Sequence, residues 1–231
     1  MPLFNKPVQA SRTLRVLAHL LAYPGAELRA HLPELRAALA EEGALTAARV
    51  AELNALMDTL ARRTALDVEA DYVELFDRGR ATSLHLFEHV HGDSRERGPA
   101  MIDLAQTYEK AGLYLAEGEM PDYLPVALEF TSSQPAREAR EFLAETAHIL
   151  NAIFAALQQR RSPYASVLGA LLELAGETAQ PVKVVPDEAI DDLWQEPPAF
   201  DGCSSKGQAA PGTPQPIHLV RTPRKVEGAR A

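Results

Sequence analysis

Apolar residues recur every three to four positions along most of this sequence, and the alternation of a half-buried β-strand is almost absent. Such spacing places the apolar side chains on one face of a helix, where they can pack against other helices. The stripes occupy residues 11–23, 28–39, 46–60, 67–76, 84–92, 99–111, 121–130, 135–157 and 163–174. The pattern therefore predicts an all-α protein with seven to nine helices.

Residues that favour helix ends define several of the boundaries. Ser11 and Thr46 are expected to cap helices with their side-chain oxygens. Proline fits the first turn of a helix, so Pro121 and Pro135 are expected to begin two others. Asp122 would then lie in a first helical turn, where its negative charge favours the helix dipole.

Residues 197–231 differ in composition from the rest of the chain. They hold six prolines, few large apolar side chains, and five Lys or Arg against two acidic residues. A segment of this kind cannot bury enough apolar surface to offset the entropy of ordering it. We therefore expect one helical domain over residues 1–196 and a flexible, basic tail over residues 197–231.

Charge and cysteine content exclude several classes of protein. A formal net charge of −9 argues against nucleic-acid binding, which requires a basic surface. The single cysteine, Cys203, cannot form an internal disulfide or a cysteine-based zinc site, and such sparse use fits a reducing compartment. No apolar run reaches the roughly 20 residues that span a bilayer. We expect a cytoplasmic protein without membrane insertion.

A histidine-rich segment is the one candidate for metal chemistry. His85, Glu88 and His89 form the string H-x-x-E-H, in which two histidines four residues apart on a helix could share one ion. That interpretation requires a third ligand and a sheet-containing scaffold, and the sequence indicates neither. Phosphate-binding glycine loops and nucleophile elbows are absent from the sequence. We expect a protein that is not an enzyme and holds no cofactor.

Three segments combine aromatic and polar residues in a way that a buried helix face does not require. They are DYVELF at residues 71–76, LFEHVHGDSRERGPAMIDL at 86–104, and EMPDYLPVALEF at 119–130. Together they fit a groove that receives an amphipathic helical peptide.

These segments resemble those of the respiratory nitrate reductase assembly chaperones, the NarJ or delta subunit family, within the TorD-like group of molybdoenzyme chaperones. LFEHVHGDSRERG is typical of the nitrate reductase branch, whereas D-Y-x-x-L-F and P-D-Y-L are similar to motifs of the wider group. W-x-E-P-P at Trp194–Pro198 extends the likeness, which covers about residues 10–200.

The resemblance implies a TorD-like helical chaperone that binds the N-terminal segment of the apo catalytic (alpha) subunit of nitrate reductase. Such a chaperone promotes insertion of the molybdenum cofactor and an iron–sulfur cluster, delays membrane docking, and is not part of the mature enzyme. Molybdenum-cofactor biosynthesis proteins are expected as further partners.

The same resemblance implies which residues form the peptide-binding groove. Its apolar residues are expected to be Tyr72, Phe76, Phe87, Met101, Leu104, Tyr108, Tyr123, Leu124 and Phe130. Its polar rim is expected to comprise His89, Arg95, Arg97, Asp103, Asp122 and Glu129. Because an unperturbed histidine titrates near pH 6.5, His85, His89 and His91 are hypothesised to make peptide affinity depend on pH.

Two alternative functions remain open at this point. One is a small helical metalloprotein that uses His85, His89 and a further ligand. The other is an adaptor whose tail, residues 200–231, makes the contact with its partner. Metal analysis tests the first, and deletion of the tail tests the second.

Overall fold

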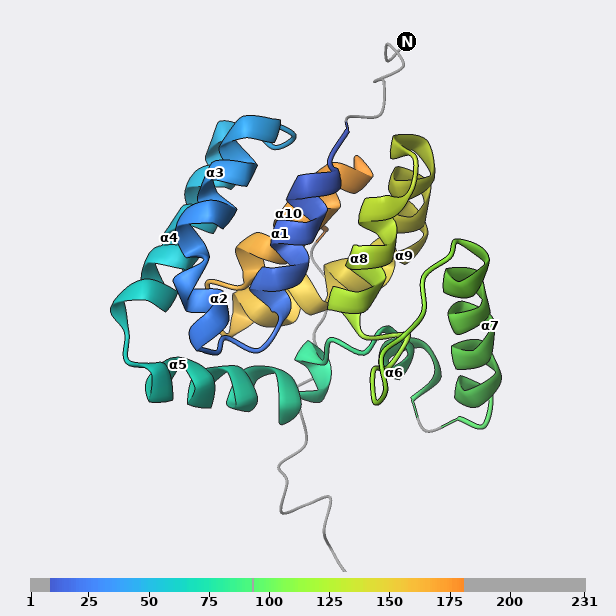
Figure 1. Ribbon diagram of the computed structural model, residues 1–231. Helices are drawn as coiled ribbons and strands as arrows, with labels where there is room; N and C mark the ends of the chain where they lie inside the picture. The colour runs from blue at the N-terminus through green and yellow to red at the C-terminus, as the bar shows by residue number, and fades with distance from the viewer. Residues whose placement is uncertain (1–8, 93, 181–231) are drawn as a thin grey trace, which may run out of the picture. The chain divides into compact units, whose positions relative to one another are not determined.

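A computed structural model describes residues 9–92 and 94–180, and this part of the chain is built from helices (Figure 1). The α-helices are α1 (Ser11–Leu21), α2 (Ala26–Ala30), α3 (Leu32–Glu42), α4 (Ala47–Arg62), α5 (Ala65–Tyr72), α6 (Leu86–His91), α7 (Arg97–Lys110), α8 (Leu124–Ser133), α9 (Ala136–Gln159) and α10 (Ala165–Ala175). A π-helical turn (Val73–Asp77) and a 3-10 turn (Arg80–Thr82) follow α5. The described residues form no β-strand, so the predicted all-α class is confirmed, with ten α-helices where seven to nine were expected.

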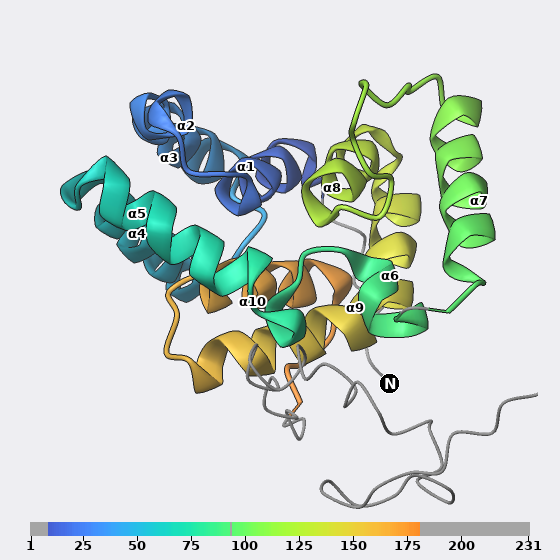
Figure 2. The ribbon, with the colours of Figure 1, turned by 90° about the horizontal axis from the view of Figure 1, so that it is seen from below.

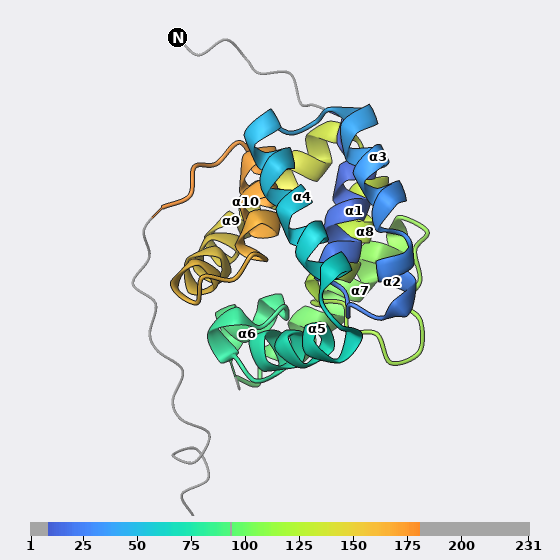
Figure 3. The ribbon, with the colours of Figure 1, turned by 90° about the vertical axis from the view of Figure 1, so that its left-hand side faces the viewer.

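Helix α1 forms the centre of the bundle. It packs against α8 on one side and α3 on the other, with α10 crossing behind it (Figure 1). Its apolar face is fully buried at Leu17, Leu20 and Leu21. Helix α10 is buried along nearly its whole length, because α9 covers one side of it and α4 lies against another (Figure 3). Burial of these leucines supplies most of the driving force for the fold.

Helices α5 and α7 lie at the margin of this bundle. Helix α5 crosses its lower end, and α7 stands beside α8 and α9 (Figure 2). Most of α7 is only half-buried or exposed, and Tyr108 near its C-terminus is its buried residue. Helix α7 therefore leaves most of its surface accessible.

The helix starts show which sequence signals were sufficient. Thr46 caps α4 as predicted, since its hydroxyl accepts a hydrogen bond from the backbone N–H of Arg49. Pro135 likewise precedes α9 directly. Ser11 does not cap α1: the Glu42 carboxylate reaches across from α3 and accepts bonds from the backbone N–H groups of Arg12 and Thr13. A side chain distant in sequence has taken the capping role.

The prediction that Pro121 begins a helix was wrong. Helix α8 starts at Leu124, and Asp122 lies in the turn before it, outside the first helical turn. The physical reason is that Leu124 and the residues near it hydrogen-bond to a distant segment, as described below. The dipole role expected for Asp122 therefore does not apply.

Several predictions fall outside the described residues. They concern the 196/197 domain boundary, the basic tail, Cys203 and the motif at Trp194–Pro198, and they stay predictions. In the part of the chain that the structure describes, no helix is both long and apolar enough to cross a membrane.

Candidate functional site

Two of the segments singled out in the sequence meet side by side. His85 and Tyr123 form an isolated antiparallel bridge, the only such bridge among the described residues. The backbone N–H of Leu86 donates to the carbonyl of Asp122 at 2.9 Å, and that of Leu124 donates to the carbonyl of Leu84 at 2.8 Å. This pairing holds Asp122 and Tyr123 in an extended turn and explains why α8 begins later than predicted.

The Asp122 carboxylate occupies the middle of this junction and is completely buried. One oxygen lies 3.2 Å from Nδ1 of His85. The other accepts a 3.3 Å hydrogen bond from the backbone N–H of Phe87 and lies 3.5 Å from the guanidinium of Arg97. Arg97 also reaches the Glu88 carboxylate at 3.4 Å. We call this group the polar junction and define it as His85, Glu88, Arg97 and Asp122, with Asp122 at its centre. The prediction that Asp122 lies on an accessible rim was wrong, because its side chain is completely buried.

The contact between His85 and Asp122 shifts their two pKa values in opposite directions. The hydrogen bond to Asp122 is the main reason that the pKa of His85 is raised above its ordinary value of 6.5. Burial works to raise the pKa of Asp122, but the His85 hydrogen bond and charge, the Phe87 N–H and Arg97 together lower it below 3.8. Near neutral pH, Asp122 is consequently a buried carboxylate held by donors from both neighbouring segments.

The tyrosines of the two shorter motifs form a second connection. The Tyr72 hydroxyl donates to the carbonyl of Leu21 at 2.7 Å and lies 3.1 Å from the Tyr123 hydroxyl. The ring of Tyr72 packs against Phe76 and Tyr164, with centroids 4.8 and 6.2 Å away. Burial raises the pKa of Tyr72 strongly. The D-Y-x-x-L-F motif therefore fixes α5 to α1 and to the start of α8.

The two histidines of the H-x-x-E-H string have different partners. His85 precedes α6 and lies beside Asp122, whereas Nε2 of His89 lies 2.9 Å from the backbone carbonyl of Ser83. Across residues 9–92 and 94–180, no three His, Cys, Asp or Glu side chains are grouped so that they could hold an ion. This arrangement gives the metalloprotein alternative no support.

A groove beside α8 combines apolar side chains from α7, α8 and the loop after α7 with open access. One wall is the outer face of α1, another is the loop that follows α7, and the floor is α8 itself. Its volume is about 270 Å³. We call it the α8 groove, and its lining residues are Arg15, His19, Tyr108, Leu113, Tyr114, Leu115, Glu119, Val126, Glu129, Phe130, Ser132 and Ser133.

Helix α7 is tied to the protein at both ends, and this positions the groove wall. At its N-terminus Arg97 joins the polar junction. At its C-terminus the Tyr108 hydroxyl donates to the carbonyl of Pro121 at 2.9 Å, and the Tyr108 ring stacks on Phe130 with a centroid distance of 4.6 Å. The loop after α7 begins directly beyond this anchor, with Leu113 and Tyr114 exposed. The junction and the groove are thus connected through α7.

The predicted groove residues fall into different environments. Tyr108, Phe130 and Glu129 line the α8 groove. Tyr72, Phe76 and Leu124 belong to the core, and Phe76 and Arg97 also border a polar pocket of about 540 Å³ next to the junction. The half-buried members are Phe87, His89, Met101, Leu104 and Tyr123, and the exposed ones are Arg95 and Asp103. A peptide contact by any of them stays a prediction.

Several groove residues were missed from the sequence. They are Arg15 and His19 on α1, the run Leu113–Leu115, Glu119, Val126, Ser132 and Ser133. One signal was present: Leu113, Tyr114 and Leu115 are three large apolar residues in a loop bounded by Gly112 and Gly118, both at positive φ. Nothing in the sequence indicates that α1 would form the opposite wall.

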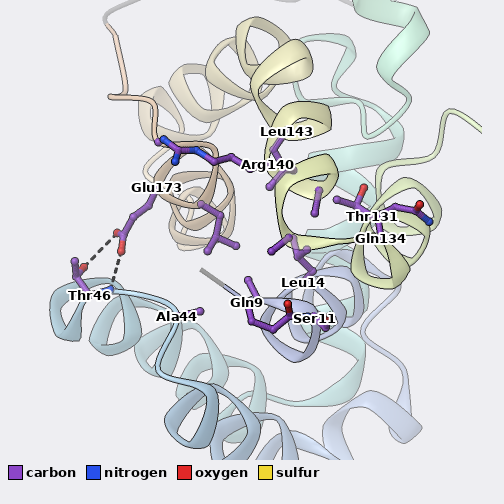
Figure 4. Close-up of a pocket in the computed structure, with 15 residues that line it drawn as sticks. Gln9, Ser11, Leu14, Ala44, Thr46, Thr131, Gln134, Arg140, Leu143 and Glu173 are labelled. Atoms are coloured by element: carbon purple, nitrogen blue, oxygen red, sulfur yellow. Dashed lines mark hydrogen bonds between the residues drawn. The ribbon is translucent and has the colours of Figure 1, made fainter. Parts of the chain in front are cut away.

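A pocket at the other end of α1 shows a different use of charge (Figure 4). The Glu173 carboxylate accepts bonds from the backbone N–H and the hydroxyl of Thr46, at 2.7 and 3.2 Å. Nε of Arg140 donates to the carbonyl of Ala175 at 3.2 Å. The charged side chains of this pocket therefore hold the ends of α4 and α10 in place, and their role is structural.

The fold is shared with a protein from Archaeoglobus fulgidus named as a redox enzyme maturation protein. The two superimpose with a TM-score of 0.52 at 20% identity, over 77% of this chain and 100% of the other. The two proteins therefore share the same helical fold.

Sequence comparison identifies the family. The model of the nitrate reductase delta subunit family matches residues 22–169, and the chain belongs to this family. It is 45% identical to the nitrate reductase molybdenum cofactor assembly chaperone NarJ of Escherichia coli (strain K12), over 79% of this chain and 82% of that protein. It is 32% identical to a Bacillus subtilis (strain 168) protein assigned the same chaperone role, over 69% of this chain and 86% of that one.

Proposed function

We propose that this protein is a chaperone for the assembly of nitrate reductase and acts at the insertion of its molybdenum cofactor. The observation that carries the proposal is the 45% identity to the NarJ chaperone across most of both chains. At that level two proteins share their fold and commonly their type of partner. The chain acts in this proposal by binding and release, without catalysis.

The partner is the apo catalytic subunit of nitrate reductase, which the chaperone recognises by its N-terminal segment. The α8 groove supports this part of the proposal, because a helix can lay its apolar face into a groove of this kind. Its accessible apolar groups are suited to such a ligand: Tyr114 is 80% exposed and Leu113 is 37% exposed. Apolar residues this exposed mark interaction sites when they gather around a groove.

The sequence of events follows from the need for release. Bound chaperone keeps the client open while the molybdenum cofactor and an iron–sulfur cluster are inserted, and it delays docking at the membrane. It then dissociates and is absent from the mature enzyme, so its affinity must remain reversible, near micromolar or about −8 kcal/mol. Molybdenum-cofactor biosynthesis proteins would meet the client in this complex.

The experiment that tests the proposal is affinity capture from the cytosol of the native host, grown anaerobically with nitrate. We expect the full chain to recover the nitrate reductase catalytic subunit, and to lose it when the client's N-terminal segment is removed. A variant lacking residues 200–231 should capture it equally well. Recovery that depends on the tail, or a bait that recovers no molybdoenzyme, would contradict the proposal.

A further inference from the structure

The α8 groove contains two carboxylates, and both are exposed to solvent. Glu119 and Glu129 both line it. Glu129 is exposed, and Glu119 accepts a single backbone hydrogen bond, from the N–H of Ala116 at 3.1 Å. Neither forms an ion pair with any other residue that the structure describes.

Some carboxylates elsewhere in the described residues hold parts of the fold together. Asp122, Glu173 and Glu42 each bind groups that hold two helices or segments together. Glu119, by contrast, contacts only the turn that contains it, and Glu129 joins no two elements of the described fold. Their position beside Tyr108, Val126 and Phe130 places negative charge at the edge of an apolar surface.

The wall formed by α1 has the opposite sign. Arg15 lines the groove there, and its guanidinium Nε donates to the Ser132 hydroxyl at 3.3 Å. The charge of the groove is therefore asymmetric, with a cation on the α1 side and two carboxylates on α8 and the loop after α7. A ligand helix with Lys or Arg facing the two carboxylates is attracted to that side of the groove. A helix with acidic residues in the same place is repelled.

We propose that Glu119 and Glu129 are specificity-determining residues that bind a Lys or Arg located beside the apolar stripe of the client helix. This inference rests on the proposed function and names the feature by which the groove distinguishes its ligand from other amphipathic helices. The apolar walls supply affinity for any such helix, whereas the two carboxylates favour those with a cation in the correct place. When the helix covers the groove it displaces water, and the charge pairs become less screened.

The test uses the full chain and a synthetic peptide of about 15 residues, or roughly four helical turns. The peptide has apolar residues at i, i+3, i+4 and i+7 and two Lys beside this stripe, and binding is followed by calorimetry. Replacing both Glu119→Lys and Glu129→Lys is expected to weaken binding about tenfold, since each exposed pair contributes modestly and reversal adds repulsion. The loss should shrink in 1 M salt, where the Debye length is about 3 Å.

Two controls make the result specific. Glu145→Lys changes the net charge in the same sense at an exposed position on α9 away from the groove, and it should leave the affinity unchanged. A peptide in which both Lys are replaced by Glu should bind the wild type weakly and the double variant more tightly. This rescue depends on charge complementarity and does not follow from a general disturbance of the groove.

The outcomes separate this inference from the proposed function. Suppose that the Lys peptide binds the wild type. If Glu145→Lys then weakens this binding as much as the double variant does, or if the Glu peptide binds the double variant no more tightly than the wild type, the roles assigned to Glu119 and Glu129 are overturned. The chaperone proposal stands in either case. If the wild type binds neither the Lys peptide nor the N-terminal peptide of the catalytic subunit, both are overturned.

Discussion

The polar junction and the α8 groove lie at opposite ends of α7 and differ in what their polar groups contact. In the junction, Asp122 is completely buried, and its partners His85, Phe87 and Arg97 belong to the same fold. In the groove, Glu119 and Glu129 face an open apolar surface without forming ion pairs with other described residues. The difference teaches that polar residues of one sequence segment can serve different ends: Asp122 stabilises the scaffold, whereas Glu119 and Glu129 are the residues that we propose for binding.

The largest expected effect concerns the junction. Asp122→Ala removes the carboxylate that accepts hydrogen bonds from Phe87 and His85. It also leaves Arg97 with Glu88 as its remaining acidic partner among the described residues. We expect the free energy of unfolding to fall by about 3 kcal/mol, as found when one member of a buried charged group is deleted. Urea denaturation measures it. Asp103→Ala, at an exposed position on α7, is the control and should change little; equal stability of the two variants would contradict the role assigned to Asp122.

A smaller loss is expected at the tyrosine contact that fixes α5 to α1. Tyr72→Phe keeps the ring packing but removes the hydroxyl that donates to the Leu21 carbonyl. The buried carbonyl then lacks this donor, so we expect a loss of about 1–2 kcal/mol in the free energy of unfolding. The matched change Tyr114→Phe alters an 80% exposed ring and should have no effect on unfolding. A Tyr72→Phe protein as stable as the wild type would show that this contact is dispensable.

In the groove, a substitution should weaken peptide binding and leave the stability of the protein unchanged. Tyr114→Ala removes an exposed aromatic side chain and should leave the melting temperature unchanged, while peptide binding weakens by about 1 kcal/mol or more, at least fivefold. Leu66→Ala, equally exposed at 76% but outside the groove, should alter neither property. Calorimetric titration and thermal melting of the same samples provide both values. A fall in melting temperature without loss of binding would place Tyr114 in the scaffold.

The smallest effect is a pH dependence of stability. The pKa of His85 is raised in the folded state, so its contribution is complete below its unfolded value of about 6.5 and is lost as the pH rises through the folded value. The pKa of Asp122 is lowered, so its contribution is present above its unfolded value and is lost as the pH falls through the folded value. The stabilising window therefore lies between about pH 4 and pH 6.5.

Urea denaturation at a series of pH values measures this window. In His85→Gln the decline in stability just above pH 6.5 should disappear, whereas His148→Gln, on the exposed side of α9, should keep it. If stability still declines in His85→Gln as it does in the wild type, a titrating group other than His85 causes the decline.

Local patterns in the sequence were sufficient for the helices but not for the site. The stripe that follows Pro135 predicted α9, and Thr46 predicted the start of α4, because both signals act within one or two turns. Asp122 was misplaced because its partner His85 lies 37 residues away, and a proline followed by an acidic residue fits a helix start equally well. The α1 wall of the groove was missed for the same reason, since Arg15 and Ser132 meet across 117 residues of sequence. Tertiary contacts of this kind leave no periodic trace in the chain.

The most direct test of the account is an NMR titration of isotope-labelled protein with the N-terminal peptide of the nitrate reductase catalytic subunit. We expect the largest chemical-shift changes on the outer face of α1, at residues 113–119 and along α8, with peptide nuclear Overhauser effects to Tyr114 and Val126. Changes centred instead on the polar pocket, which is lined by residues 76–80, Ser83, His85 and Arg97 among others, would contradict the claim that the α8 groove is the binding site.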